Sequence, residues 1–231
     1  ADPSTTPKHA SEFWMIEPEM AFYDFEDLMI LIEDFIKSVT RDVKDSCPSE
    51  LAFFKKFINK ELDKRYDAIL NNKFEKITYT EAIDILRKSN KNFENEPLWG
   101  EDLFSEHERY LTDEYFKKPV FVTEYPSSFK AFYMRENEDG KTVACLDLLV
   151  PYVGEIITGS QREERYDVLK RKIEEKGMDE NVYEWYLDIR KWGSAPHSGF
   201  GLGFERLIMY LTGMENIRDT IPYPRNKGKI Y

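Results

Sequence analysis

The sequence is poor in cysteine and has no long apolar run. Its two cysteines, Cys47 and Cys145, lie far apart and in no metal-ligand spacing. This argues against a zinc site and predicts a reducing compartment. No stretch approaches the roughly 20 apolar residues that a membrane-spanning helix needs, and the N-terminus lacks the apolar segment of a signal peptide. We therefore expect a soluble, cytoplasmic protein with no membrane partner.

Basic side chains are outnumbered as well. The 231 residues include 33 lysines and arginines against 44 aspartates and glutamates, which gives a formal net charge of −11. A surface this acidic repels phosphate backbones on average, which argues against non-specific nucleic-acid binding by this chain alone. With 41% apolar residues, the composition is that of a globular protein, and the length suits one large domain.

The periodicity of the chain predicts helices first and strands later. Asp24 can cap a helix, a second helix is expected over residues 49–70, and Thr78 forms a capping box with Glu81. Strands are expected over residues 119–125, 129–134, 142–150 and 155–158, with an Asp-Gly turn at 139–140. Short connections force neighbouring strands to be antiparallel. The predicted fold class is α+β, an antiparallel sheet flanked by helices.

A further strand is expected near the N-terminus, within residues 12–22. At a period of two, one face carries Phe13, Met15, Glu17 and Glu19. The opposite face carries Trp14, Ile16, Met20 and Phe22, and we expect it to be buried in the core. The acidic face is either a solvated outer surface or the floor of a polar pocket.

Alternating glycines mark a second strand near the C-terminus. Gly199, Gly201 and Gly203 follow neither the G-x-G-x-x-G order nor a P-loop. They describe a strand with one face stripped of side chains, over which a flat ligand can lie. Arg206 then falls in the first turn of a helix, where its charge opposes the helix dipole. Either a bound anion such as a triphosphate or a structural Arg–Glu pair would offset that cost.

Two carboxylates and an arginine lie between these strands. Asp147 and Glu155 flank the turn at Pro151, so a hairpin can bring them together. Facing carboxylates need a proton, a cation or an arginine between them, and magnesium that bridges phosphate oxygens is one solution. Arg162, expected at the start of a helix that includes residues 163–165, suits a carboxylate, an amide oxygen or a phosphate.

Three segments taken together resemble a known family. Residues 12–19, 154–165 and 196–206 appear in the order found in the catalytic domain of class II aminoacyl-tRNA synthetases, and within that class they resemble the asparaginyl-tRNA synthetase family. The resemblance covers essentially the whole chain, to the Ile-Pro-Tyr-Pro-Arg run at 221–225. Aspartyl-tRNA synthetases are the related family.

The resemblance implies ATP-dependent ligation of asparagine to tRNA(Asn) through an asparaginyl-adenylate, with ATP and Mg²⁺ as cofactors and a homodimer as the full-length assembly. Residues 1–231 would be the C-terminal portion of the catalytic domain, without motif 1 and the anticodon-binding domain. Residues 24–118 would be a mainly helical insertion after motif 2. The family's motif 2 arginine would precede Ala1, so we expect this chain alone to be catalytically impaired.

The resemblance also assigns site residues. Arg206 and Glu155 would be catalytic. The ATP-binding residues would be Lys8, His9, Phe13, Glu155, Gly203, Phe204, Glu205 and Arg206; the amino-acid-binding residues Glu17, Thr158 and Arg162; and the metal ligands Asp147, Glu155 and Thr158. Three alternatives stay open: an aspartyl-tRNA synthetase, an asparagine-synthetase-like enzyme of the same fold, and a non-catalytic synthetase-like module.

Overall fold

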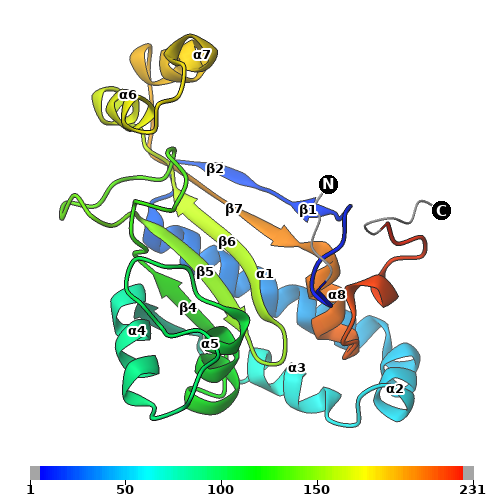
Figure 1. Cartoon of the computed structure of the whole chain (residues 1–231). Coiled ribbons are helices and arrows are strands. Elements are labelled where there is room, and N and C mark those ends of the chain that lie inside the picture. The colour runs from blue at the N-terminus through cyan, green and yellow to red at the C-terminus, as the bar shows by residue number, and fades with distance from the viewer. Residues whose placement is uncertain (1–5, 226–231) are drawn as a thin grey trace.

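The computed structural model describes residues 6–225 and is built around one seven-stranded sheet (Figure 1). Its neighbours run in the order β1-β7-β6-β5-β4-β3, and β2 also pairs with β7. The strands are β1 (Met15–Ile16), β2 (Glu19–Ala21), β3 (Glu75–Thr78), β4 (Val120–Thr123), β5 (Cys145–Val150), β6 (Gly154–Gln161) and β7 (His197–Gly203). The first and last strands of the chain therefore lie side by side.

The sheet is mixed, which corrects the purely antiparallel prediction at one edge. All strand pairs are antiparallel except β3 with β4. A long crossover joins these two strands through α4 (Tyr79–Lys88), α5 (Ser105–Arg109) and a π-helical turn, η1 (Tyr110–Tyr115), and such a crossover is what parallel pairing needs. The strand expected over residues 129–134 is wrong, because only Met134 forms a bridge there, to Arg162.

Helices α1 (Phe25–Ser46), α2 (Pro48–Phe57), α3 (Leu62–Leu70) and α8 (Phe204–Thr212) gather on one side of the sheet (Figure 1). Residues such as Leu28 and Ile32 pack there against Ile157 and Leu202 of the strands. The Asp24 side chain caps α1 as predicted. The single helix expected over residues 49–70 is instead two, α2 and α3.

The opposite side of the sheet is covered over only part of its width. Helix α4, α5 and η1 pack on β3, β4 and β5 through Ile77, Val122, Leu149 and their neighbours. The predicted capping box of Thr78 and Glu81 begins α4. Residues 24–118 thus hold α1 to α5 and η1, but also contribute β3 to the sheet. The part of this face over β6 and β7 is left for the candidate site.

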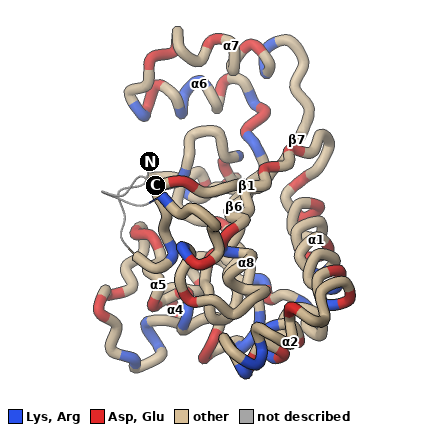
Figure 2. The backbone as a smooth tube through the Cα atoms, turned by 90° about the vertical axis from the view of Figure 1, so that its right-hand side faces the viewer, with Lys and Arg blue, Asp and Glu red and all other residues tan. Residues whose placement is uncertain are grey.

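Helices α6 (Tyr166–Glu175) and α7 (Glu180–Lys191) form a hairpin that stands away from the sheet (Figures 1 and 2). It has a small core of its own around Leu169, Ile173 and Leu187. Acidic residues follow the outer side of α1 in Figure 2, where they contribute to the negative charge of the chain. Among the described residues, no helix is both long and apolar enough to cross a membrane.

Candidate active site

Strands β1 and β2 pair with β7, and their side chains lie over its glycines. Glu19 pairs with Gly199, and Met15 pairs with Gly203. A Cβ atom at Gly199 would lie 2.5 Å from Glu19 Oε2, and one at Gly201 would lie 2.8 Å from Met15 Cε. The alternating glycines therefore leave one face of β7 without side chains of its own, as predicted. Side chains of β1 and β2 occupy the space above that face. Phe13 and Met15 of the acidic face line a pocket, whereas Glu17 and Glu19 are exposed, so each of the two alternatives left open by the sequence describes part of this face.

The opposite face of the same segment is not a core face. Trp14 is 70% exposed and Phe22 is 78% exposed, which contradicts the expectation from the alternating pattern. The physical reason is a break at Glu17 and Pro18, which divides the segment into two short strands at the sheet edge. No continuous pleat remains to turn one set of side chains inward.

Sheet register places two of the three predicted metal ligands in one row, whereas Glu155 lies opposite Leu149. Asp147 lies opposite Thr158, and Thr158 lies opposite Gly201. The Thr158 hydroxyl donates to Asp147 Oδ1 at 2.7 Å, and Lys130 Nζ lies 2.9 Å from Asp147 Oδ2. Lys130 also lies 3.9 Å from the centre of the Tyr125 ring. The sequence analysis missed this lysine because the segment that carries it was predicted to be an ordinary strand.

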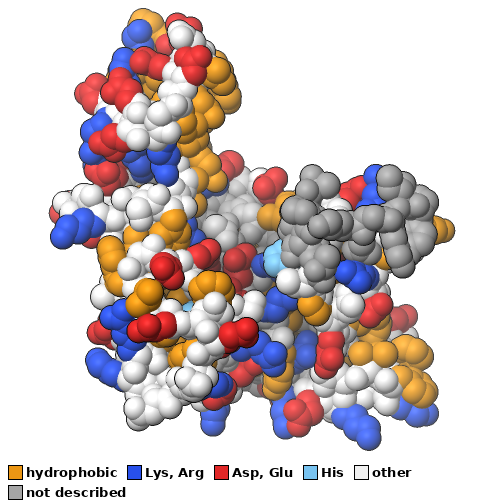
Figure 3. All heavy atoms as spheres, in the orientation of Figure 1, with side chains coloured by type: hydrophobic (Ala, Val, Ile, Leu, Met, Phe, Trp, Pro, Cys, Tyr) orange, Lys and Arg blue, Asp and Glu red, His pale blue; other side chains and the backbone are white. Residues whose placement is uncertain are grey.

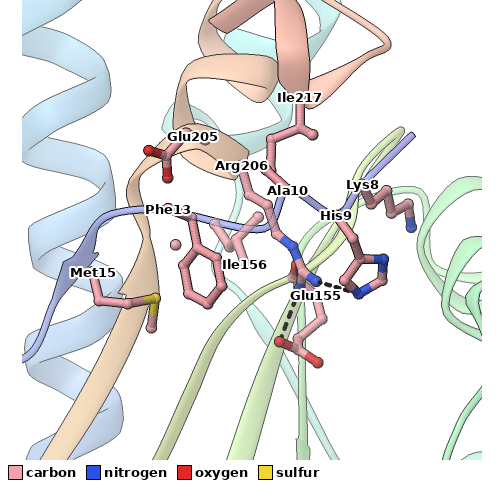
Figure 4. A pocket seen from close by; sticks show the side chains of 11 residues that line it. Lys8, His9, Ala10, Phe13, Met15, Glu155, Ile156, Glu205, Arg206 and Ile217 are labelled. Carbon is pink, nitrogen blue, oxygen red and sulfur yellow. Dashed lines mark hydrogen bonds and ion pairs between the residues drawn. The ribbon is translucent and has the colours of Figure 1, made fainter. Parts of the chain in front are cut away.

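Several predicted ATP-binding residues converge on one pocket (Figure 4). The Phe13 ring and the Arg206 guanidinium line the same cavity, as the sequence analysis required. Arg206 Nη1 donates to the Glu155 carbonyl oxygen at 2.9 Å and to Glu155 Oε1 at 3.1 Å. The pocket lining is completed by Lys8, His9, Ala10, Met15, Ile156, Gly203, Glu205 and Ile217.

The two residues after Gly203 take different positions. Both Glu205 carboxylate oxygens accept the Trp14 backbone N–H at 3.0 Å, so Glu205 fixes the segment that presents Phe13. Phe204 does not line the pocket; its ring lies 6.2 Å from that of Trp14. The family resemblance implied an ATP-binding role for both residues without distinguishing them.

A second group of polar residues lies further along the sheet. Arg162 Nε donates to Glu19 Oε1 at 3.0 Å, and Arg162 Nη1 donates to the Ser160 hydroxyl. Glu17 lies on the same sheet face, since a Cβ atom at Gly201 would be 3.6 Å from its Oε1. Glu19, and not Glu17, is thus the acid that meets Arg162. Acidic side chains are visible in the hollow at the centre of Figure 3.

Arg162 does not begin a helix, which corrects the sequence prediction. Helix α6 starts at Tyr166. Glu163 prevents an earlier start because its fully buried carboxylate accepts hydrogen bonds from the Arg165 side chain and the Glu136 backbone N–H. A helix over residues 163–165 would break this arrangement.

Charged side chains around the pocket shift the pKa of Glu155. Burial and the neighbouring carboxylate of Asp147 raise the pKa of Glu155 to about 7, while Arg206 opposes that rise. Glu108, which the sequence analysis did not single out, adds to it from α5. Lys8 Nζ lies 3.7 Å from Glu108 Oε2. The site therefore holds three neighbouring acids whose repulsion a cation would relieve.

The donor atoms fit a magnesium ion that also binds phosphate. In the described part of the chain, no three histidine, cysteine or acidic side chains lie close enough to hold a metal by themselves. Glu155, Asp147 and Thr158 nevertheless supply the oxygen atoms that magnesium prefers, and the pKa of Glu155 is raised first by burial and then by the neighbouring carboxylate of Asp147. Magnesium commonly takes one or two carboxylates and completes its shell with phosphates and water.

This combination of fold and site is that of a class II aminoacyl-tRNA synthetase. Residues 2–227 match the family described as tRNA synthetases class II (D, K and N), and the chain belongs to this family. Within it, the chain is 60% identical to the asparagine–tRNA ligase of Clostridium perfringens (strain 13 / Type A) and 58% identical to that of Clostridium beijerinckii. Both matches extend over 228 residues, 99% of this chain and 49% of the relative.

Solved structures agree with the sequence relatives. The asparaginyl-tRNA synthetase from Pyrococcus horikoshii, complexed with asparaginyl-adenylate, is 40% identical with a TM-score of 0.83. The Entamoeba histolytica enzyme in complex with the same adenylate is 34% identical with a TM-score of 0.87. Each match covers 100% of this chain and 51% of the solved chain. The predicted family is confirmed, and the chain spans about half the length of the curated relatives it matches.

Proposed function

We propose that this chain carries the ATP and asparagine sites of an asparagine–tRNA ligase. The observation that carries the proposal is one uncovered sheet face with Phe13 and Arg206 at one end and the Arg162–Glu19 pair further along. A nucleotide and an amino acid bound at these two places would meet between them. The relatives named asparagine–tRNA ligase and the neighbours that hold asparaginyl-adenylate support asparagine as the amino acid.

The proposed reaction has two steps. The asparagine carboxylate attacks the α-phosphate of ATP, which gives asparaginyl-adenylate and pyrophosphate. The terminal hydroxyl of tRNA(Asn) then takes the acyl group and releases AMP. Neither step needs a covalent bond to the protein, so positioning and charge neutralisation provide the rate.

Each side chain has a defined task in this scheme. The Phe13 ring stacks on adenine, and Arg206 neutralises phosphate charge. Arg162 donates to the side-chain amide oxygen of asparagine, and Glu17 accepts from the substrate ammonium group. Glu19 fixes the guanidinium plane of Arg162 through their ion pair. Magnesium held at Glu155, with Asp147 and Thr158 beside it, would supply further positive charge to the phosphates.

The remaining partners follow the same proposal. The net charge of −11 indicates that tRNA affinity comes largely from other parts of the full-length enzyme, which we expect to be a cytoplasmic homodimer. Cys47 and Cys145 are free thiols, as a reducing compartment would favour.

The test is amino-acid-dependent exchange of pyrophosphate into ATP, measured with asparagine and with aspartate on the full-length enzyme. We expect exchange with asparagine and little with aspartate. The positive charge of Arg162 is paired with the negative charge of Glu19, so the site does not favour a negatively charged substrate side chain over a neutral amide. A preference for aspartate would overturn the assignment. Failure of a non-hydrolysable asparaginyl-adenylate analogue to bind, measured by calorimetry, would instead indicate a non-catalytic module.

A further inference from the structure

Glu108 lies behind the nucleotide pocket and contacts two of its walls. Its side chain is 12% exposed, and it is not part of the pocket lining. Oε2 lies 3.7 Å from Lys8 Nζ, in the N-terminal segment, and accepts the Glu155 backbone N–H at 3.3 Å, at the start of β6. One carboxylate therefore connects pocket residues that are 147 positions apart in the chain (155 − 8).

The backbone next to Glu155 leaves room for this contact. Gly154 has a φ of +86°, in the region that favours glycine. A Cβ atom there would lie 2.9 Å from Lys8 Nζ and closer still to Glu108 Oε2. The Thr112 hydroxyl donates to the Glu108 carbonyl oxygen at 2.9 Å, which fixes the end of α5. The Thr112 hydrogen bond thus fixes the backbone at Glu108, and the Glu155 N–H and Lys8 face its carboxylate.

The Lys8 ammonium has hydrogen-bonding capacity to spare. At 3.7 Å its contact with Glu108 is an ion pair but not a hydrogen bond. Its Nζ is buried, and no described residue accepts a hydrogen bond from it. Lys8 lines the pocket and lies beyond His9 from Phe13 in Figure 4, so a turn of its side chain toward the cavity would let a ligand oxygen accept from the ammonium.

The surroundings of Lys8 would otherwise repel a cation. Burial lowers the pKa of Lys8, and the charges of Arg206 and Arg109 lower it further, whereas Glu108 raises it. Without the Glu108 charge, a flexible lysine would gain by turning toward solvent, because a buried ammonium without a counter-charge is costly.

We propose that Glu108 is a positioning residue for ATP, which holds the Lys8 ammonium at the pocket wall so that its unused donors meet the phosphates. Glu108 does not touch the nucleotide; it acts through Lys8. The inference rests on the proposed ATP site, and it predicts a phosphate-specific effect, because adenosine binding depends on Phe13 and not on Lys8.

The experiment measures the affinities of Mg–ATP and adenosine by calorimetry for the full-length enzyme that contains the unaltered chain and for its Glu108→Gln, Lys8→Met and double variants. Glu114→Gln is the matched control, since Glu114 is an exposed acid in the next turn that pairs with Lys91. We expect Glu108→Gln to weaken ATP binding about tenfold and adenosine binding less than about twofold. The double variant should bind ATP no more weakly than Lys8→Met, and the control should be unchanged.

The contrary results are distinct. Equal losses for ATP and adenosine, or losses that add in the double variant, would show that Glu108 is only structural. Unchanged ATP binding by Glu108→Gln, in a chain whose unaltered form binds ATP, overturns the inference and leaves the proposed function intact. An unaltered chain that binds neither ligand removes the ATP site itself and the inference with it.

Discussion

Replacing Gly199 with alanine should weaken asparagine binding while leaving the fold intact. The added Cβ atom would lie 2.5 Å from Glu19 Oε2 and closer still to the rest of that carboxylate. An ordinary contact is near 3.5 Å, so the carboxylate must move by roughly 1 Å. The Glu19 side chain is 53% exposed and can move away, but it then leaves the Arg162 guanidinium without its partner.

The two consequences differ in size. The Glu19 end of the ion pair is half exposed, and Arg162 keeps its hydrogen bond to Ser160, so loss of the pair should change the free energy of unfolding by less than about 1 kcal/mol. A misdirected Arg162 would lose a charge-assisted hydrogen bond to the substrate, worth about 1.5–3 kcal/mol, which corresponds to a rise in the asparagine KM of at least about tenfold. The KM for ATP should stay within about twofold, because Phe13 and Arg206 lie at the other end of the site.

The assay is pyrophosphate exchange over a range of asparagine concentrations, with the melting temperature measured in parallel. Glu19→Gln reaches the same pair without adding a Cβ atom and should raise the asparagine KM in the same direction. An increase with Gly199→Ala but none with Glu19→Gln would refute the reasoning. So would a large loss of stability with unaltered KM.

Three further predictions concern other parts of the site. Phe13→Ala should raise the KM for ATP roughly tenfold through lost stacking, with little change in melting temperature because the ring is 49% exposed. The pKa of Glu155 is raised to about 7 from an ordinary 4.5. Between these two pH values the folded chain holds a proton that the unfolded chain releases. The free energy of unfolding should therefore fall as pH rises from about 4.5 to about 7. Urea denaturation at several pH values should show this fall in the unaltered chain but not in Glu155→Gln. The fall should be below about 2 kcal/mol, because over a third of the Glu155 side chain is exposed and its charge is screened by solvent. Glu163→Ala should lower the free energy of unfolding by about 2 kcal/mol in the same assay, because it removes a buried carboxylate that accepts hydrogen bonds from Arg165 and from the Glu136 backbone N–H.

The parts of the fold that depend on local chemistry could be predicted from sequence. Asp24 and Thr78 cap their helices as expected, because capping involves residues within one turn. The alternating glycines predicted a stripped strand face for a similar reason, since the period of a strand is fixed by its backbone. The meeting of Phe13 and Arg206 needed the family resemblance as well, because no local rule joins residues so far apart.

The features that depend on tertiary neighbours could not be predicted. The four residues of β3 pair in parallel with β4, and only the position of the crossover decides that. Trp14 and Phe22 follow a buried-strand pattern but lie at the edge of the sheet, where 70% and 78% of their surface stays exposed. Glu108 did not stand out in its own segment; its carboxylate lies against Gly154, which is distant in sequence and is brought there by the tertiary fold.

The central place of β7 has a consequence for how the protein is made. This strand, which ends at Gly203, separates β1 and β2 from β6. While the protein is being synthesised, β6 therefore has an unpaired edge until β7 has been made, and the pairing of β1 and β2 with β7 forms only then. The nucleotide and amino-acid parts of the proposed site are therefore assembled at the same late stage. A chain that terminates before β7 would lack both.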